Sequence, residues 1–270
     1  MSETTLEVED GVAVFTLNRP EKMNAISQNM FEHDLPDMVA RVSKDDDIRV
    51  LILAGAGGNF CSGADVSRMG GDKKPSPEDR DNKLRSILDY LYKLVNLPKP
   101  VISAVDGNAF GGGFSLAVTA DIVMATPRAR FSLVFGRIGL IPDMTAAYVL
   151  PRLIGPQQTK ELTFTARSFG VDEAVSMGIV QEVYEAEALL PAAKRIAAQL
   201  SHGSSTAMAE AKRLIDMSLQ SSQAEMIDAE CAAQLACRGT EFHGEAVRRF
   251  MTKEPRLYDW DAMSQKQAAE

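Results

Sequence analysis

Two glycine-rich segments carry backbone that could bind a carbonyl oxygen. The first is FCSGAD at residues 60–65, and the second runs from Gly107 to GGG at residues 111–113. Each follows a short apolar run and precedes a predicted helix, whose first N–H groups are free and lie at the positive end of the helix dipole. Small residues let a ligand approach those groups closely. Two such N–H groups that face each other form an oxyanion hole, which stabilises a carbonyl oxygen as it gains negative charge.

Other chemistry has less support in the sequence. The second segment has the spacing G-x-x-x-G-G-G, which is neither G-x-G-x-x-G nor a P-loop with its Lys-Ser/Thr pair. Three cysteines without a CxxC pair, and only three histidines, predict neither a metal site nor a disulfide scaffold. Cys61 has no histidine near it in sequence, so a small packed residue is favoured over a nucleophile. A purely structural role for the glycine turns stays open at this point.

The strands that must position these segments are short and apolar. Asp10-Gly11 between alternating apolar residues predicts a hairpin over residues 6–17. Runs rich in branched residues predict buried strands at 49–54, 101–105 and 122–125.

Helices are predicted between and after these strands. Apolar residues at helical spacing predict helices over 24–43 and 84–95, with a further helix over 114–120. Pro36 should kink the first of them or shift its boundary. Residues 70–81 are polar and contain two prolines, which indicates a mobile surface loop. No strand pattern follows Val183, and residues 186–251 are helical in composition. We therefore expect an α/β core over residues 1–195 and a C-terminal helical region over residues 196–270.

The composition excludes several classes of protein. The 270 residues are 45% hydrophobic and 24% charged, values typical of a folded globular chain rather than a disordered or collagen-like one. The net charge of −8 argues against nucleic acid as a partner, because phosphate neutralisation needs a basic surface. The polar, acidic N-terminus lacks the features of a signal peptide, and the longest uncharged run near the middle is too short to cross a bilayer. The sequence thus predicts a cytoplasmic protein without a membrane partner.

Five motifs resemble those of the crotonase superfamily, the enoyl-CoA hydratases and isomerases. They are NRP with NA at 18–20 and 24–25, FCSGAD at 60–65, Gly107 with GGG at 111–113, IGLIP at 138–142 and LPRLIG at 150–155. They follow the family's order and spacing over nearly the whole chain. The resemblance implies a spiral of β-β-α units, followed by helices that form trimers, which can pair into hexamers. It also implies an acyl-CoA thioester as ligand, with coenzyme A as part of the substrate and no further cofactor or metal.

The same resemblance implies roles for individual residues. The oxyanion hole would be the backbone N–H groups of Ala64 and Gly112. Typical hydratases carry two glutamates at positions that are Ser115 and Phe135 here, so both carboxylates needed to activate water and deliver a proton are absent. Asp143 stands where several isomerases of the family carry a Glu or Asp, and the form Ile-Pro-Asp resembles the phenylacetate-pathway isomerase group especially.

A single carboxylate suits a double-bond shift. Asp143 could remove a proton from C2 of a 3-enoyl thioester, hold it and return it at C4. Apolar neighbours should raise the pKa of its carboxyl group towards a useful value; they are Phe135, Leu140, Ile141 and Met144. A helix-capping role for Asp143 is the alternative.

The remaining predicted positions surround the acyl-CoA. The substrate-binding residues are Ala25, Cys61, Ser62, Gly63, Asp65, Arg68, Met69, Gly111, Ser115, Phe135 and Pro142, with Asp65 also a candidate helix cap. Candidates for the CoA phosphates are Lys22, Arg68, Lys253 and Arg256. The leading hypothesis is an enoyl-CoA isomerase. The alternatives are a hydratase with an unusual acid or base, a thioester hydrolase, and a non-catalytic acyl-CoA-binding protein.

Overall fold

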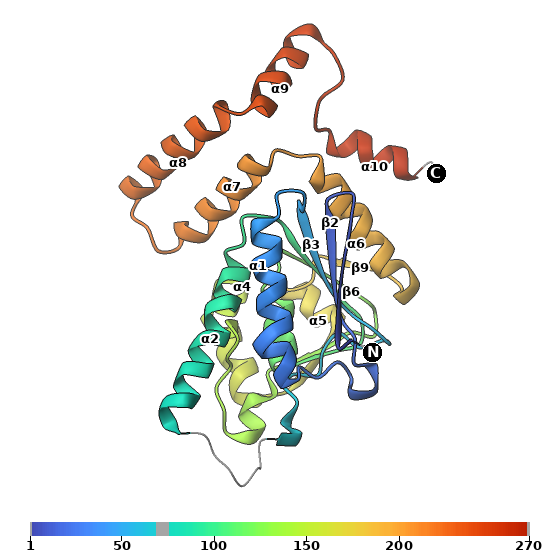
Figure 1. The fold of residues 1–270 in the computed structure, drawn as a ribbon, viewed down its shortest axis with the longest axis vertical. Coiled ribbons are helices and arrows are strands. Elements are labelled where there is room, and N and C mark those ends of the chain that lie inside the picture. Colours follow the sequence, from blue (N-terminus) through green and yellow to red (C-terminus); the bar gives the residue numbers. More distant parts are fainter. Residues whose placement is uncertain (1, 69–75, 269–270) are drawn as a thin grey trace.

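The computed structural model describes residues 2–68 and 76–268, and they form a mixed α/β fold with a helical C-terminal region (Figure 1). The larger sheet has the strand order β1-β2-β3-β4-β6-β9. Only β1 and β2 pair antiparallel, whereas the strands from β2 to β9 are parallel. The bounds are β1 (Thr4–Glu9), β2 (Val12–Leu17), β3 (Val50–Gly55), β4 (Val101–Val105), β6 (Ile122–Ala125) and β9 (Glu182–Val183). The predicted hairpin and the three predicted buried strands are confirmed.

Successive residues of a strand point to opposite faces of the sheet, and apolar residues on both faces of this sheet are covered. In β2, Val12 and Val14 face helix α6 (Ala186–Ser201), while Phe15 and Leu17 belong to the core on the other face. Helices α1 (Leu35–Lys44), α2 (Pro77–Val95) and α3 (Gly112–Ala117) supply apolar residues to that second core. Strands that are apolar at nearly every position are expected in a parallel sheet whose two faces are both covered.

A second sheet has three strands, and the first of them lies within the second glycine-rich segment. It consists of β5 (Asn108–Phe110), β7 (Arg130–Ser132) and β8 (Ser168–Gly170), and three phenylalanines pack against one another beside it: Phe114, Phe131 and Phe169. The sequence predicted an uninterrupted turn over residues 107–113. That prediction was wrong for residues 108–110, because their backbone pairs with β7.

Three predicted helix boundaries also need correction. The helix predicted over residues 114–120 is α3, which begins at Gly112 and ends at Ala117. The predicted helix over residues 24–43 begins at residue 28, with a π-helical turn over Met30–Asp34 directly before α1, and Pro36, which has no N–H to donate, lies where this turn passes into α1. Helix α2 begins at Pro77, capped by the Ser76 side chain, so residues 77–81 are helical rather than part of a loop. Residues 70–75 of that predicted loop lie outside the described residues.

The predicted helical C-terminal region is confirmed. It comprises α7 (Ser205–Ser218), α8 (Gln223–Arg238), α9 (Glu241–Thr252) and α10 (Trp260–Ala268), after the connecting elements α4 (Ala146–Thr165) and α5 (Val171–Ser176). Hydroxyl side chains of Ser204, Ser222 and Thr240 cap α7, α8 and α9. Helices α8 and α9 project beyond the sheets (Figure 1). The predicted division at residues 195 and 196 falls inside α6, and it stays a prediction.

Candidate active site

The structure joins the two glycine-rich segments through their backbones. Cys61 and Ala109 form an isolated parallel bridge, in which the Cys61 N–H donates to the Asn108 carbonyl and the Phe110 N–H donates to the Cys61 carbonyl, both at 2.9 Å. A Cβ built on Gly113 would lie 2.2 Å from the Cys61 carbonyl oxygen. Only glycine allows α3 to start this close to the first segment.

This arrangement brings together the two N–H groups that the sequence singled out. A Cβ built on Gly112 would lie 3.9 Å from the Ala64 nitrogen. Within residues 2–68 and 76–268, neither the Ala64 N–H nor the Gly112 N–H donates to any acceptor. Gly112 is also the first residue of α3, where a free N–H is expected. Two free donors on adjoining turns can hold one oxygen atom between them.

The first turn is held in place by the segment around Ile26. The Ile26 N–H donates to the Gly63 carbonyl at 2.8 Å, and the Asp65 N–H donates to the Ile26 carbonyl at 2.9 Å. Arg19 donates to the Asp65 carboxylate at 3.1 Å and to the Ala25 carbonyl at 2.7 Å. Arg19 was identified from the sequence only as part of the NRP motif, and its hydrogen bonds to Asp65 and Ala25 were not predicted.

The Asp65 carboxylate is held by hydrogen bonds rather than available as an acid or base. Its carboxylate accepts hydrogen bonds from the Ser67 hydroxyl and N–H, at 2.6 and 3.2 Å. These bonds and the one from Arg19 lower the pKa of Asp65 to about 2. This agrees with the capping role considered for Asp65, at the start of the short 3-10 helix Val66–Arg68.

The two positions that lack a carboxylate are filled in different ways. Ser115 is fully buried, and its hydroxyl donates to the Gly111 carbonyl at 3.3 Å within its own helix. The ring of Phe135 is buried beside the second turn, with its Cζ 3.9 Å from a Cβ built on Gly111. Neither side chain can activate a water molecule as a glutamate would.

Asp143 is half-buried, and burial raises the pKa of its carboxyl group above the ordinary value. Among the described residues, only its own backbone N–H donates to that carboxyl group. The expected cause of the shift was partly wrong, because Leu140 and Ile141 are 50% and 78% exposed and shield little. Asp143 does not cap α4 either, since Thr145 occupies the N-cap position and no side chain there accepts a cap hydrogen bond.

The two residues after Asp143 have a backbone conformation that is rare outside glycine. Met144 has φ 52° and Thr145 has φ 74°, both in the left-handed region. This turn directs the Met144 side chain at Gly112, where a Cβ would lie 2.5 Å from the Met144 sulfur. The segment that carries Asp143 thus packs onto the second turn. Strained residues of this kind cluster at functional sites. The sequence indicated Met144 only as an apolar neighbour of Asp143, and it did not indicate the backbone conformation of Met144 or Thr145.

The other predicted residues are distributed as follows. Ala25, Cys61 and Pro142 are buried, and Ser62 donates to the Lys22 carbonyl at 3.4 Å. Met69 lies outside the described residues, as does the side chain of Arg68. Lys22 is exposed near the first turn, whereas Lys253 and Arg256 follow α9 in the projecting region (Figure 1). Within one chain, the structure therefore brings only Lys22 of these three near the first turn.

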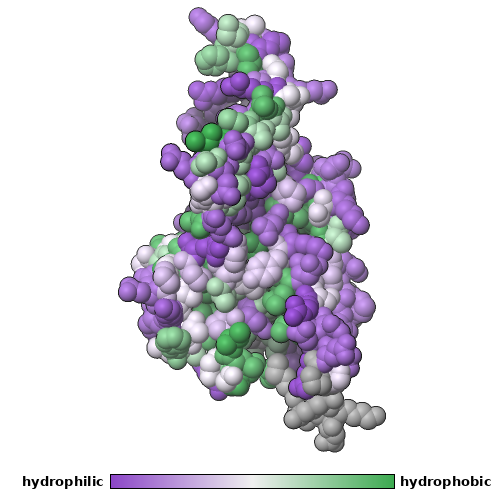
Figure 2. Space-filling view, turned by 90° about the vertical axis from the view of Figure 1, so that its left-hand side faces the viewer, coloured by the Kyte–Doolittle hydropathy of each residue, from purple (hydrophilic) through white to green (hydrophobic). Residues whose placement is uncertain are grey.

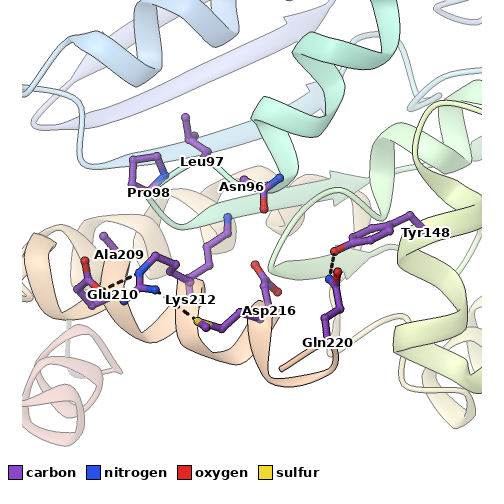
Figure 3. Close-up of a pocket in the computed structure, with 11 residues that line it drawn as sticks. Asn96, Leu97, Pro98, Tyr148, Ala209, Glu210, Lys212, Asp216 and Gln220 are labelled. Atoms are coloured by element: carbon purple, nitrogen blue, oxygen red, sulfur yellow. Dashed lines mark hydrogen bonds and ion pairs between the residues drawn. The ribbon is translucent and has the colours of Figure 1, made fainter. Parts of the chain in front are cut away.

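Two cavities lie away from these turns, where α7 meets α2 and α4. One measures about 280 Å³; Figure 3 shows its lining, with the Gln220 side chain donating to the Tyr148 hydroxyl at 2.8 Å. The other measures about 570 Å³ and contains the ion pair between Lys212 and Asp121, at 2.9 Å. Neither is lined by a residue predicted for the site. Among the described residues, no three His, Cys, Asp or Glu side chains form a metal-binding group.

Comparison with known proteins gives consistent matches. The sequence profile of the enoyl-CoA hydratase/isomerase family matches residues 7–261. The chain is 34% identical over 248 residues to a 1,2-epoxyphenylacetyl-CoA isomerase of Escherichia coli, covering 91% of this chain and 94% of that protein. It is 31% identical over 255 residues to a short-chain-enoyl-CoA hydratase of Clostridium acetobutylicum, covering 94% and 96%. The crystal structure of an enoyl-CoA hydratase/isomerase from Cupriavidus metallidurans superposes with a TM-score of 0.89, at 38% identity and 96% coverage of both chains.

Proposed function

Because the chain belongs to the enoyl-CoA hydratase/isomerase family, we propose that it moves the double bond of a 3-enoyl-CoA to the 2-position. The substrate's thioester oxygen lies between the N–H groups of Ala64 and Gly112. Asp143 acts as the only acid and base. The observation that carries this proposal is the half-buried carboxylate of Asp143, which no other side chain among the described residues hydrogen-bonds and whose neighbour Met144 packs on the second turn, together with a serine and a phenylalanine where a hydratase has its glutamates.

The reaction needs two proton transfers and no water. The Asp143 carboxylate takes a proton from C2, and the electron pair of that C–H bond forms the C1–C2 double bond of a dienolate whose negative charge lies on the thioester oxygen. The two N–H donors stabilise this oxygen. The protonated Asp143 then delivers the proton to C4, where the C3–C4 π pair forms the new C–H bond; the C1–C2 π pair moves to C2–C3, and the thioester carbonyl re-forms. The raised pKa of Asp143 favours holding the proton between the two steps.

Hydration of a 2-enoyl-CoA is the second candidate, favoured by the similarity to the Clostridium acetobutylicum hydratase. Incubation with crotonyl-CoA and, separately, with a 3-enoyl-CoA distinguishes the two reactions. We expect the conjugated chromophore to appear from the 3-enoyl-CoA and to persist with crotonyl-CoA. Loss of the chromophore from crotonyl-CoA at a comparable rate would identify a hydratase instead.

The same incubations test the remaining alternatives. Release of free thiol would indicate a thioester hydrolase. A protein that binds acyl-CoA, yet does not exchange the C2 proton with deuterated water, would be a non-catalytic binding protein. We expect neither result.

We also propose that the chain forms a homotrimer or hexamer through its C-terminal helices. Large apolar side chains are exposed on α8 and α9, and Figure 2 shows hydrophobic colour on this projecting part; they include Ile227, Leu235, Val247, Phe250 and Met251. Such patches mark contact surfaces. Light scattering after gel filtration measures the assembly mass, and a monomer would contradict the proposal. No helix among the described residues is long and apolar enough to span a membrane. The cytoplasm is the proposed location, supported by three cysteines that are all free thiols.

A further inference from the structure

We propose that Met144 determines which acyl groups this chain accepts, by excluding substituents on C2 of the bound thioester. This inference rests on the proposed function for the placement of the thioester. It depends on three features of Met144: its contact with Gly112, its burial and its backbone conformation. None of these features was indicated by the sequence.

The contact places the Met144 thioether beside the two donors. The direction in which a side chain would leave Gly112 points to the Met144 sulfur, 2.5 Å from the ideal Cβ position, and the Met144 methyl carbon lies 3.7 Å from the same point. That point is also 3.9 Å from the Ala64 nitrogen. The thioether therefore borders the gap in which the two N–H groups would hold an oxygen atom.

The connectivity places the same thioether beside C2. An oxygen held by Ala64 and Gly112 is bonded to C1, and C2 must lie within reach of the Asp143 carboxylate for proton removal. Met144 directly follows Asp143 in the chain and its sulfur contacts the Gly112 turn, so one short segment carries both the base and the thioether that borders the gap. A second substituent on C2 would have to occupy the space that the thioether fills.

The surroundings keep the Met144 side chain in this place. Met144 is 3% exposed, and it belongs to the main hydrophobic core together with Phe135. The left-handed backbone at Met144 and Thr145 is costly for residues with a Cβ, so the turn persists because its neighbours hold it. A close-packed interior resists the displacement of even one methylene group.

The proposal predicts discrimination between two saturated ligands of equal carbon number. Butyryl-CoA has one carbon substituent on C2, and isobutyryl-CoA has two. We expect wild-type protein to bind butyryl-CoA more tightly, by roughly tenfold or more, the scale of discrimination that a packed apolar pocket achieves. In Met144→Ala the ratio should fall to near one, because the smaller side chain leaves room for the second methyl group. Isothermal titration calorimetry measures both dissociation constants.

Two further variants show whether the volume of residue 144 is the cause. Met144→Leu keeps most of the volume without sulfur and should keep the wild-type ratio. Met177→Ala shortens a half-buried methionine at the end of α5 and should also keep it. The proposal is overturned if Met144→Ala retains the wild-type ratio, if Met144→Leu loses it as Met144→Ala does, or if wild-type protein does not discriminate.

Failure of this proposal is distinguishable from failure of the proposed function. Saturated ligands undergo no double-bond shift, so their binding ratio is measured whether or not the protein is an isomerase. An inactive protein with the expected ratios would refute the isomerase and retain the role of Met144. An active isomerase whose ratios do not respond to Met144→Ala would do the reverse. Absence of acyl-CoA binding by the wild-type protein overturns both.

Discussion

Cys61 and Ala109 pair backbone to backbone, and this single parallel bridge ties the loop after β3 to the short strand β5. Ala64 lies three residues after one partner and Gly112 three residues after the other. The relative position of their N–H groups is therefore set by main-chain hydrogen bonds and by close glycine contacts. Neighbouring glycines in this arrangement should respond very differently to the same substitution.

Gly112→Ala should fold and lose activity. Its new Cβ would meet the Met144 sulfur at 2.5 Å, and although packing holds the unbranched thioether in place, a bonded methyl group displaces it at a smaller cost than it would displace backbone atoms. The displaced thioether and the new methyl group then crowd the gap between the two N–H donors. We expect kcat for a 3-enoyl-CoA to fall by about 10²–10³, the effect of losing one oxyanion donor, with a small change in melting temperature.

Gly113→Ala is the matched control for that variant. Its Cβ would lie 2.2 Å from the Cys61 carbonyl oxygen and 2.7 Å from the Cys61 carbonyl carbon, and this backbone is fixed by the bridge to Ala109. We expect little folded protein, as judged by thermal denaturation and circular dichroism. A stable, fully active Gly113→Ala variant would contradict the described packing of the two segments.

Asp143→Asn should abolish proton transfer and keep ligand binding. An amide cannot accept the C2 proton, so we expect kcat to fall by about 10²–10⁴, the usual contribution of a positioned acid or base. The dissociation constant for butyryl-CoA should change by less than about threefold, because the N–H donors remain. Asp172→Asn, on the exposed side of α5, serves as control and should keep full activity. Full activity in Asp143→Asn would assign the proton shuttle to another group.

Stability should depend on pH through Asp143. Burial raises the pKa of its carboxyl group in the folded protein above the value in the unfolded chain. Its contribution therefore favours folding below the unfolded pKa and is lost as pH rises through the folded pKa. At pH 7 the ionised carboxylate opposes folding, so Asp143→Asn should have the higher melting temperature. The difference should shrink as pH falls towards about 4, near the ordinary pKa of aspartate. A difference that grew on acidification would contradict the direction of the shift.

Thr145→Gly should stabilise the protein. Thr145 has φ 74°, and its hydroxyl is buried without a hydrogen-bond partner among the described residues. Glycine removes both penalties, at a cost of about 0.5–1 kcal/mol in chain entropy. We expect a gain of about 1 kcal/mol in the free energy of unfolding, measured by urea denaturation. Ala166→Gly (φ 47°) relieves a left-handed backbone alone and should gain less. An equal or larger gain there would show that the hydroxyl is not the main penalty.

Thiol labelling should separate Cys61 from Cys231. Cys61 is fully buried, and burial raises the pKa of its thiol to about 12, so it stays protonated and inert at neutral pH. Cys231 is exposed on α8. In the native protein we expect iodoacetamide to reach Cys61 only after unfolding, whereas Cys231, one turn from Ile227 and Leu235 on the proposed contact face, is modified once the assembly dissociates, as detected by peptide mass spectrometry. Rapid modification of Cys61 in the native protein would contradict this burial and support Cys61 as a nucleophile.

Local sequence patterns were sufficient for the buried strands and for the presence of small-residue turns after them, but not for the bridge that pairs these turns. Val50 to Gly55 is apolar throughout and Val101 to Val105 is apolar except for Ser103. Each run leads into small residues, so strand, turn and neighbouring helix follow from short-range chemistry. The strand β5 could not be predicted in the same way. Its three residues depend on pairing with Arg130–Ser132, about twenty residues away.

The surroundings of Asp143 show the same limit within the site. The sequence identified this carboxylate and predicted its raised pKa, but it credited Leu140 and Ile141, which face solvent. Hydrophobic periodicity does not give the direction of side chains in an irregular loop, because such a loop has no regular repeat. The contact between Met144 and Gly112 results from two consecutive left-handed residues that are not glycine, a conformation that propensity argues against.

The two N–H donors belong to the main chain. Side-chain substitutions can therefore change the reaction while the oxygen-binding gap stays the same. A substitution at Ala64 other than proline replaces a methyl group and leaves the N–H in place, whereas a substitution at Ser115, Phe135, Asp143 or Met144 changes the side chain itself. Genetic drift at those four positions can therefore exchange one acyl-CoA chemistry for another without rebuilding the scaffold. Lineages with this backbone can diversify by a few codon changes, and members with similar folds need not share a reaction.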